Sequence, residues 1–219
     1  FLMIRRPPRS TLDRSSAASD VYKRQEHYYS QLDFPKSVFI GEDDRLYGTW
    51  VMGNNYQVKS TYYGGYPHGY LKRIKALFPD KKKVFHLFGG KVDTEIIDGK
   101  TIDINPKMKP DYLGDAHNMS EFIDEKFDLI LADPPYSVED CEHYGTTMVK
   151  RTTILKECVK LLEDKGHLVW LDQVLPMYKK AELKTTGYIG MVKSTNHRFR
   201  VVTIFEKQEK QELLTPFFS

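Results

Sequence analysis

The stretch FDLILADPPY, residues 127–136, joins a mostly apolar run to two adjacent prolines. A short apolar run bounded by a turn signal is typical of a strand that is buried on both faces of a parallel sheet. The prolines fix two backbone φ angles and remove two N–H donors, which makes a stiff loop whose carbonyls are free to accept hydrogen bonds. The stretch therefore predicts a buried strand that ends in a rigid, acceptor-rich loop, formed by Asp133, Pro134, Pro135 and Tyr136.

Further strands and helices are expected on both sides of this stretch. Apolar runs predict strands over residues 84–89, 101–105, 111–116 and 166–176, and a closing antiparallel pair over 188–194 and 197–207. Apolar residues at helical spacing predict helices over 70–78 and 147–163. This alternation predicts an α/β fold with a mostly parallel, doubly wound sheet and an antiparallel C-terminal strand pair. Because the connection between the first two of these strands is short, we expect its crossover helix to be short or absent.

The composition of the chain changes along its length. Residues 1–25 are rich in Arg, Ser and Pro and lack a hydrophobic period. They resemble the translation of a sequencing adapter, so we expect a non-native, disordered segment; a basic nucleic-acid-binding arm is the alternative. Residues 26–66 are polar and aromatic and form an N-terminal extension. Residues 67–207 hold the expected sheet, and residues 208–219 form a weakly packed tail.

Charge and cysteine content narrow the classes of protein. Residues 1–25 hold six basic and two acidic residues, so without them the formal net charge falls from +3 to −1 and gives no sign of a nucleic-acid partner. No stretch approaches the ~20 apolar residues of a membrane span, so we expect no membrane contact. Two cysteines, Cys141 and Cys158, fit a reducing cytoplasm, and they do not have zinc-ligand spacing with His143. We therefore expect a cytoplasmic protein without a metal.

The DPPY loop has the chemistry to hold an aromatic amine. An exocyclic amine is a double hydrogen-bond donor, so the Asp133 carboxylate and the Pro134 carbonyl are two suitable acceptors for it. The ring of Tyr136 offers a flat face on which a base removed from the helix can stack. An ordinary strand-ending turn is the alternative for the motif alone. Its place after a buried strand, with marked ends on three earlier strands, favours the chemical interpretation.

The order of these features resembles a known family. A glycine turn, an acidic strand end, an Asp loop and DPPY follow one another as in the amino-methyltransferases with the DPPY signature, whose class-I Rossmann-like fold binds S-adenosylmethionine. More narrowly, the chain resembles the small phage and prophage DNA adenine-N6 methyltransferases without a separate recognition domain, and the resemblance covers about residues 63–205. It implies that residues 67–207 are a methyltransferase domain with S-adenosylmethionine as its cofactor.

The resemblance also implies where the cofactor binds. The family's glycine loop, which passes under the methionine part of the cofactor, matches the turn made by Leu87, Phe88, Gly89 and Gly90. Lys91 departs from the family's pattern, which favours a small residue there. The family's last cofactor motif matches Tyr63-Gly64-Gly65-Tyr66-Pro67, in which Tyr66 is the candidate contact; an aromatic core patch is the alternative.

Two acidic strand ends complete the implied cofactor site. Asp103 matches the family's acceptor for both ribose hydroxyls, a bidentate role suited to a carboxylate. Asp115 and Ala116 match the loop that binds the adenine, in which the carboxylate accepts from the amino group and the next backbone N–H meets a ring nitrogen. A solvated Asp at a strand end and an Asp in a turn are the alternatives.

The resemblance implies direct, metal-free methyl transfer to adenine N6 of a flipped base in double-stranded DNA, because Asp is usual at position 133 in adenine enzymes. Alternatives are a guanine or adenine methyltransferase acting on RNA, a cytosine-N4 methyltransferase, and a non-catalytic relative that only binds nucleic acid. Without a separate recognition domain, we expect the target to be recognised by residues 26–66 and by the loop after Tyr136. The segment 196–200, with Arg198 and Arg200 on either side of Phe199, is expected to be a solvated turn or a phosphate contact.

Overall fold

The structure is a computed structural model that describes residues 16–31, 37–53, 65–144, 146–193 and 198–209. Its main feature is one sheet of nine strands in the order β1-β2-β8-β9-β7-β6-β3-β4-β5. The strands are β1 Val38–Ile40, β2 Leu46–Met52, β3 Val84–Leu87, β4 Lys100–Asp103, β5 Tyr112–Leu113, β6 Phe127–Ala132, β7 Leu162–Asp172, β8 Leu183–Lys193 and β9 Phe199–Lys207.

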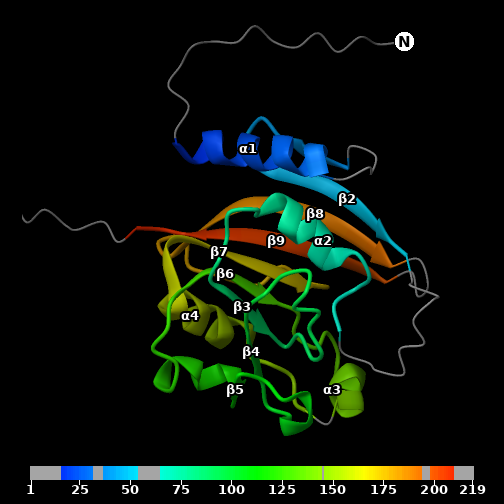
Figure 1. Cartoon of the computed structure of the whole chain (residues 1–219), viewed down its shortest axis with the longest axis vertical. Helices are drawn as coiled ribbons and strands as arrows, with labels where there is room; N and C mark the ends of the chain where they lie inside the picture. The colour runs from blue at the N-terminus through cyan, green and yellow to red at the C-terminus, as the bar shows by residue number, and fades with distance from the viewer. Residues whose placement is uncertain (1–15, 32–36, 54–64, 145, 194–197, 210–219) are drawn as a thin grey trace, which may run out of the picture.

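Most strands of the sheet run in one direction. β5, β4, β3, β6 and β7 form parallel neighbours, and β9 is antiparallel to both β7 and β8. β2 then pairs in parallel with β8, and β1 pairs antiparallel with β2. The carboxyl ends of all the parallel strands therefore lie at the same edge of the sheet as the first residues of β9. Figure 1 shows this edge on the right, where the arrowheads of β2 and β8 point.

Apolar side chains alternate between two cores, one on each face of the sheet. The first core lies under α1 (Ser16–Gln31) and α2 (Tyr70–Leu77) and includes Trp50, Ile189 and Val202. The second lies under α4 (Arg151–Leu161) and the 3₁₀ helix η2 (Ala116–Glu121) and includes Phe85, Ile130 and Trp170. A sheet with helices on both faces is doubly wound. Two short helices, α3 (Val138–Tyr144) and η1 (Pro106–Met108), complete the fold.

The predicted fold class is confirmed. The sheet is mostly parallel and doubly wound, and β8 and β9 form the antiparallel C-terminal pair. The described residues between β3 and β4 form no helix, as expected for so short a connection. The strands expected over 101–105, 111–116 and 166–176 all end earlier than predicted. β4 and β7 also begin earlier, β7 directly after α4, whereas β5 is reduced to Tyr112–Leu113.

The N-terminal part is more regular than the sequence suggested. Residues 16–25 depart from the expected disorder, because they lie in α1, where Val21 is buried in the first core. Residues 26–66 also contain β1 and β2, which lengthen the sheet beyond β8. The adapter origin of residues 1–25 stays a prediction, and residues 1–15 lie outside the described part.

No helix among the described residues is long and apolar enough to cross a membrane. Both cysteines, Cys141 and Cys158, are free and buried. Cys141 lies in α3 and Cys158 in α4.

Candidate active site

The residues predicted to carry the chemistry lie at the carboxyl edge of the sheet. The DPPY loop follows β6, the glycine turn follows β3, Asp103 ends β4, and Asp115 follows β5. Two backbone hydrogen bonds join these segments: Asp133 N–H donates to the Leu87 carbonyl at 3.3 Å, and Gly114 N–H donates to the Asp103 carbonyl at 3.1 Å. Crevices at this edge are where open α/β sheets bind their ligands.

Within the DPPY loop, the two side chains expected to act on the amine contact each other. The Tyr136 hydroxyl donates a hydrogen bond to Asp133 Oδ1. Pro134 is buried, whereas Asp133, Pro135 and Tyr136 are half-buried. The guanidinium of Arg200, from the start of β9, lies over the Tyr136 ring, with Cζ 4.5 Å from the ring centroid. The loop therefore joins an acceptor, an aromatic face and a cation in one place.

Opposing influences set the ionisation of Asp133. Burial raises the pKa of this carboxyl to about 6, and the negative charges of Asp172 and Asp140 act in the same direction. The positive charge of Arg200 and the hydrogen bond from Tyr136 lower the pKa. The carboxyl group therefore changes its charge near neutral pH, which is common among groups in active sites.

The glycine turn has the backbone geometry that a close contact with a ligand requires. Phe88 and Gly90 adopt left-handed φ angles of 59° and 55°. A Cβ on Gly89 would lie 2.7 Å from Val92 Cγ2 and 3.2 Å from the ring of Tyr66, so a side chain at this position would displace these neighbours.

The structure brings Tyr66 to the glycine turn and to the end of β6. Its ring packs against Gly89, and its hydroxyl lies 3.4 Å from the Leu131 carbonyl, to which it donates, and 3.4 Å from His86 Nδ1. Tyr66 also stacks on Tyr70 at a centroid separation of 5.4 Å. Tyr70 and His86 are fully buried, and neither Tyr70 Oη nor His86 Nε2 has a partner among the described residues. Tyr63 and Gly64 of the same motif lie outside the described residues.

The two acidic residues expected to hold the nucleoside differ in their surroundings. Asp103 is half-buried, its Oδ1 accepts from the Asn105 N–H at 2.8 Å, and burial raises its pKa. Asp115 is exposed, and its Oδ1 accepts from both the N–H and Nδ1 of His117 at 2.9 and 2.7 Å. Asp115 thus caps η2, and the following Ala116 is buried.

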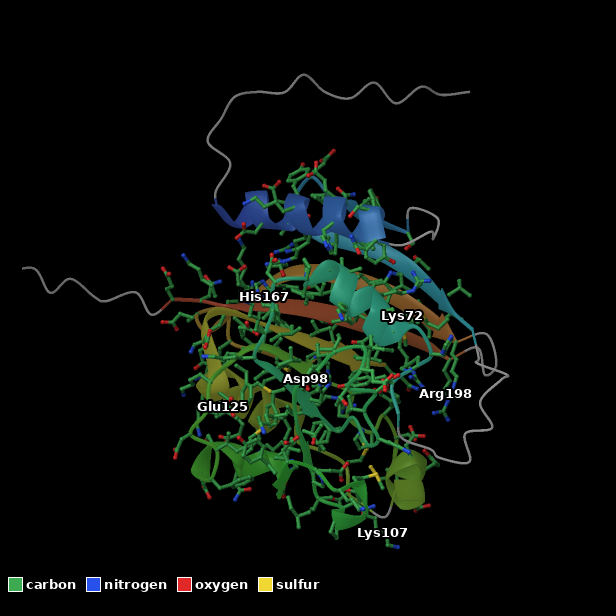
Figure 2. The ribbon with its side chains drawn as sticks, in the orientation of Figure 1. Lys72, Asp98, Lys107, Glu125, His167 and Arg198 are labelled. Carbon is green, nitrogen blue, oxygen red and sulfur yellow. The ribbon has the colours of Figure 1, made fainter. Side chains whose placement is uncertain are left out.

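Sequence reasoning missed the charge pairs around the DPPY loop. Asp172, at the end of β7, is fully buried and accepts from Arg151 Nε and Nη2 at 2.6 and 3.1 Å and from Trp170 Nε1 at 3.1 Å. Arg198 pairs with Asp140 of α3 at 3.3 Å. Figure 2 shows Arg198 at the same edge of the sheet as α3, and His167 at the opposite end of the strands. The sequence signal that could have indicated these charge pairs was the polar residues at strand ends, above all Asp172.

The strand expected over 197–207 is β9, and it includes the last two residues of the segment 196–200, which was also expected to be a turn. Phe199 and Arg200 begin β9, so Arg200 lies on a regular element beside the DPPY loop. Asn196 and His197 lie outside the described residues. Residues 32–36 and 54–64 of the expected recognition stretch 26–66 lie outside them as well.

Comparison with known proteins gives only distant likenesses. No family model and no curated protein matches the chain. Among solved structures, it is similar to TrmN from Thermus thermophilus, with 15% identity and a TM-score of 0.49 over 66% of this chain and 50% of that chain. It is also similar to the N-methyltransferase NodS from Bradyrhizobium japonicum WM9 in complex with S-adenosyl-L-homocysteine, with 14% identity and a TM-score of 0.46 over 64% and 84% of the two chains. An rRNA methylase from Streptococcus thermophilus has 10% identity and a TM-score of 0.40 over 59% and 89%.

The chain spans half the length of TrmN. At these identities and TM-scores, the likenesses assign no activity to the chain. Its function therefore has to be argued from its own residues and from the topology of its sheet.

Proposed function

We propose that the chain is an S-adenosylmethionine-dependent methyltransferase that modifies an exocyclic amine of a nucleic-acid base, with adenine N6 in DNA as its target. The observation that carries this proposal is the contact of Asp133 with Tyr136 in a DPPY loop at the carboxyl end of a buried strand. A half-buried carboxylate beside an aromatic face is suited to an aromatic amine, because one group accepts its hydrogens and the other stacks on its ring.

The turn after β3 and the end of β4 fit the cofactor. The left-handed turn at Phe88 and Gly90, with no room for a side chain at Gly89, lets a ligand approach the backbone. The half-buried Asp103 carboxylate is an acceptor for two ribose hydroxyls, and Asp115 and Ala116 lie at the next strand end. When bound, S-adenosylmethionine supplies a methyl group on a positively charged sulfur, which needs neither a metal nor a strong base to react.

Two hydrogen-bond acceptors of the loop, one side chain and one backbone carbonyl, then account for the orientation of the amine. The Asp133 carboxylate and the Pro134 carbonyl accept the two amine hydrogens and turn the nitrogen lone pair away from themselves. Acceptors fixed in a largely buried loop also favour the positive charge that develops on the nitrogen during transfer. The Tyr136 hydroxyl donates a hydrogen bond to Asp133, which keeps the Tyr136 ring in place for the base.

The test is mass spectrometry of nucleosides after reaction with DNA and, separately, with RNA. We expect the methyl label in N6-methyladenine from DNA. Label only in N4-methylcytosine, or only in RNA, would refute the assignment of the target and leave the fold intact. Sequencing of methylated DNA from an expressing cell would then give the recognition site.

A second measurement separates catalysis from binding. Asp133→Ala is expected to abolish methyl transfer while changing the affinity for S-adenosylmethionine little, since Asp133 is assigned to the amine. Calorimetric titration of both proteins measures the affinity. Near-full transfer by the variant would contradict the proposed role of the loop.

A further inference from the structure

Arg200 is placed against the site in a way that the proposed function does not explain. It is the second residue of β9, whose antiparallel course brings its first residues to the carboxyl edge of the sheet. Its guanidinium lies over the Tyr136 ring, and its charge acts on the neighbouring Asp133 carboxyl. Arg200 is therefore next to both side chains that are assigned to the target base.

The Arg200 side chain has an unused hydrogen-bond donor. Nε–H is buried, and it has no hydrogen-bond partner among the residues that the structure describes. Leaving a buried donor of a charged group without an acceptor is costly. Arginine carries donors only, so the missing partner must be an acceptor. An acceptor that arrives with a ligand would satisfy this donor.

The neighbouring arginines differ from Arg200 in this respect. Arg151 makes two hydrogen bonds to the Asp172 carboxylate, and Arg198 pairs with Asp140. Asp133 accepts a hydrogen bond from Tyr136, and the described contacts include none between Asp133 and Arg200. The site thus offers an acceptor at Asp133 and a free donor at Arg200 beside one aromatic face.

We propose that Arg200 recognises the target base by donating Nε–H to the ring nitrogen beside the amine that Asp133 accepts. This inference rests on the proposed function and specifies its substrate class. Adenine N6 and cytosine N4 lie next to an unprotonated ring nitrogen, whereas guanine and thymine place a carbonyl on the corresponding carbon, next to a protonated ring nitrogen. For a base to stack on this face of Tyr136, the guanidinium has to move from over the ring to the edge of the base, where Nε–H can reach the ring nitrogen.

The inference is tested by replacing the ring nitrogens of adenine one at a time. The probes are a short oligodeoxyadenylate and the same oligonucleotide built with 1-deazaadenine or 7-deazaadenine, each bound in the presence of S-adenosyl-L-homocysteine and measured by fluorescence anisotropy. Wild-type protein is expected to bind the 1-deazaadenine oligonucleotide about 10–100-fold more weakly, the effect of losing a hydrogen bond from a charged group, because N1 is bonded to the same carbon as the amine. The 7-deazaadenine oligonucleotide is expected to bind like adenine. Arg200→Met is expected to bind the adenine and 1-deazaadenine oligonucleotides equally.

Two variants and one further measurement control this comparison. Arg198→Met removes a neighbouring charge and is expected to keep the wild-type ratio between adenine and 1-deazaadenine. Arg200→Lys keeps the charge without Nε and is expected to lose most of the ratio. Thermal unfolding of each variant shows whether it is folded.

The outcomes separate this inference from the proposed function. Equal binding of all probes by the wild type, no binding at all, or an unchanged ratio in Arg200→Met would overturn the role of Arg200. Methyl transfer is measured in parallel with S-adenosylmethionine. Discrimination in binding without methyl transfer to any nucleic acid would overturn the proposed function and leave the recognition by Arg200 standing.

Discussion

Asp133 is a carboxyl group on which burial and neighbouring charges act in opposite directions. Burial and the charges of Asp172 and Asp140 favour its neutral form, whereas Arg200 and the Tyr136 hydroxyl favour its ionised form. Burial raises the pKa of the Tyr70 hydroxyl in α2, and the negative charge of Asp133 raises it further. The balance leaves the pKa of Asp133 at about 6, so its charge depends on pH in the range where the protein is expected to work.

The activity is expected to follow this ionisation. The carboxylate is the stronger acceptor for an amine, so kcat/KM should rise with pH through about 6 and level off above it. A pH–rate profile of the wild type measures this limb. Asp133→Asn should be nearly inactive at every pH, and a wild-type profile that stays flat between pH values well below and well above 6 would contradict the role of the carboxylate.

The free energy of unfolding should also depend on the ionisation of Asp133, but it should fall with rising pH where the activity rises. Because the folded-state pKa of Asp133 lies above its ordinary value, its contribution to stability is present below that ordinary value and is lost as the pH rises through about 6. Chemical unfolding of wild type and Asp133→Asn over this range measures the difference. Parallel pH dependences of the two proteins would show that Asp133 is not the group responsible.

Tyr136 combines two functions that substitutions can separate. Tyr136→Ala removes the stacking face and is expected to weaken base binding by ~1–3 kcal/mol. Tyr136→Phe keeps the ring and removes the hydrogen bond to Asp133, so it should be milder and should move the acid limb of the profile to higher pH. Equal losses in the two variants would contradict the importance of the ring.

Asp103 is expected to determine cofactor affinity. Asp103→Ala should weaken the binding of S-adenosylmethionine by ~1.5–3 kcal/mol, because hydrogen bonds from the ribose hydroxyls to a carboxylate are lost. Calorimetry on both proteins is the measurement. An unchanged affinity would mean that the ribose binds elsewhere.

At the scale of elements, one charge pair ties helix α4 to the carboxyl end of β7. Asp172 is fully buried, and Arg151 at the first position of α4 holds both of its oxygens. Arg151→Met leaves that carboxylate without its partner and is expected to destabilise the protein by ~3–5 kcal/mol. The matched variant Arg198→Met, whose partner Asp140 is only half-buried, should cost no more than ~1 kcal/mol. Denaturant unfolding compares the two, and equal losses would contradict this difference.

Elements built from local apolar runs could be predicted from the sequence. β6, β3 and β7 are fully or mostly buried strands, and α2 and α4 have apolar faces at helical spacing. The positions of Asp133 and Gly89 follow from β6 and β3, because each residue lies where one of these strands ends, and Asp103 lies in the same way at the end of β4. The order of these strand-end residues along the chain, which implies the chemistry, could be predicted for the same reason.

The N-terminal strands could not be predicted in this way. In β2, Leu46, Trp50 and Met52 are buried on one face, but glycine and polar residues interrupt the pattern. What holds β2 in place is its pairing with β8, more than a hundred residues later in the chain. The placement of Arg200 could not be predicted for a related reason, because Tyr136 and Asp133, beside which it lies, are more than sixty residues earlier in the chain.

At the scale of the whole molecule, the segment 1–25 can be tested for its origin. Its part of α1 buries Val21, and Arg24 Nη2 lies 2.7 Å from His167 Nε2. A chain that starts at Glu26 is expected to keep its fold and methyl transfer, with a loss of about 1.5–3 kcal/mol for the side chain of Val21. Thermal unfolding and transfer assays compare the two chains. Loss of soluble, active protein would contradict the adapter origin.

The parallel pairing of β2 with β8 also has a consequence for how the protein is made. β2 leaves the ribosome early, but the residues of β8 with which it pairs in parallel are synthesised about 140 residues later. At about 5–20 residues per second, this interval lasts roughly 7–28 seconds. During that time Trp50 and the backbone edge of β2 have no native strand on the β8 side, which exposes them to chaperones and to neighbouring nascent chains. The slowest part of the biogenesis of this protein should therefore be the closing of its sheet, after the C-terminal strands have emerged.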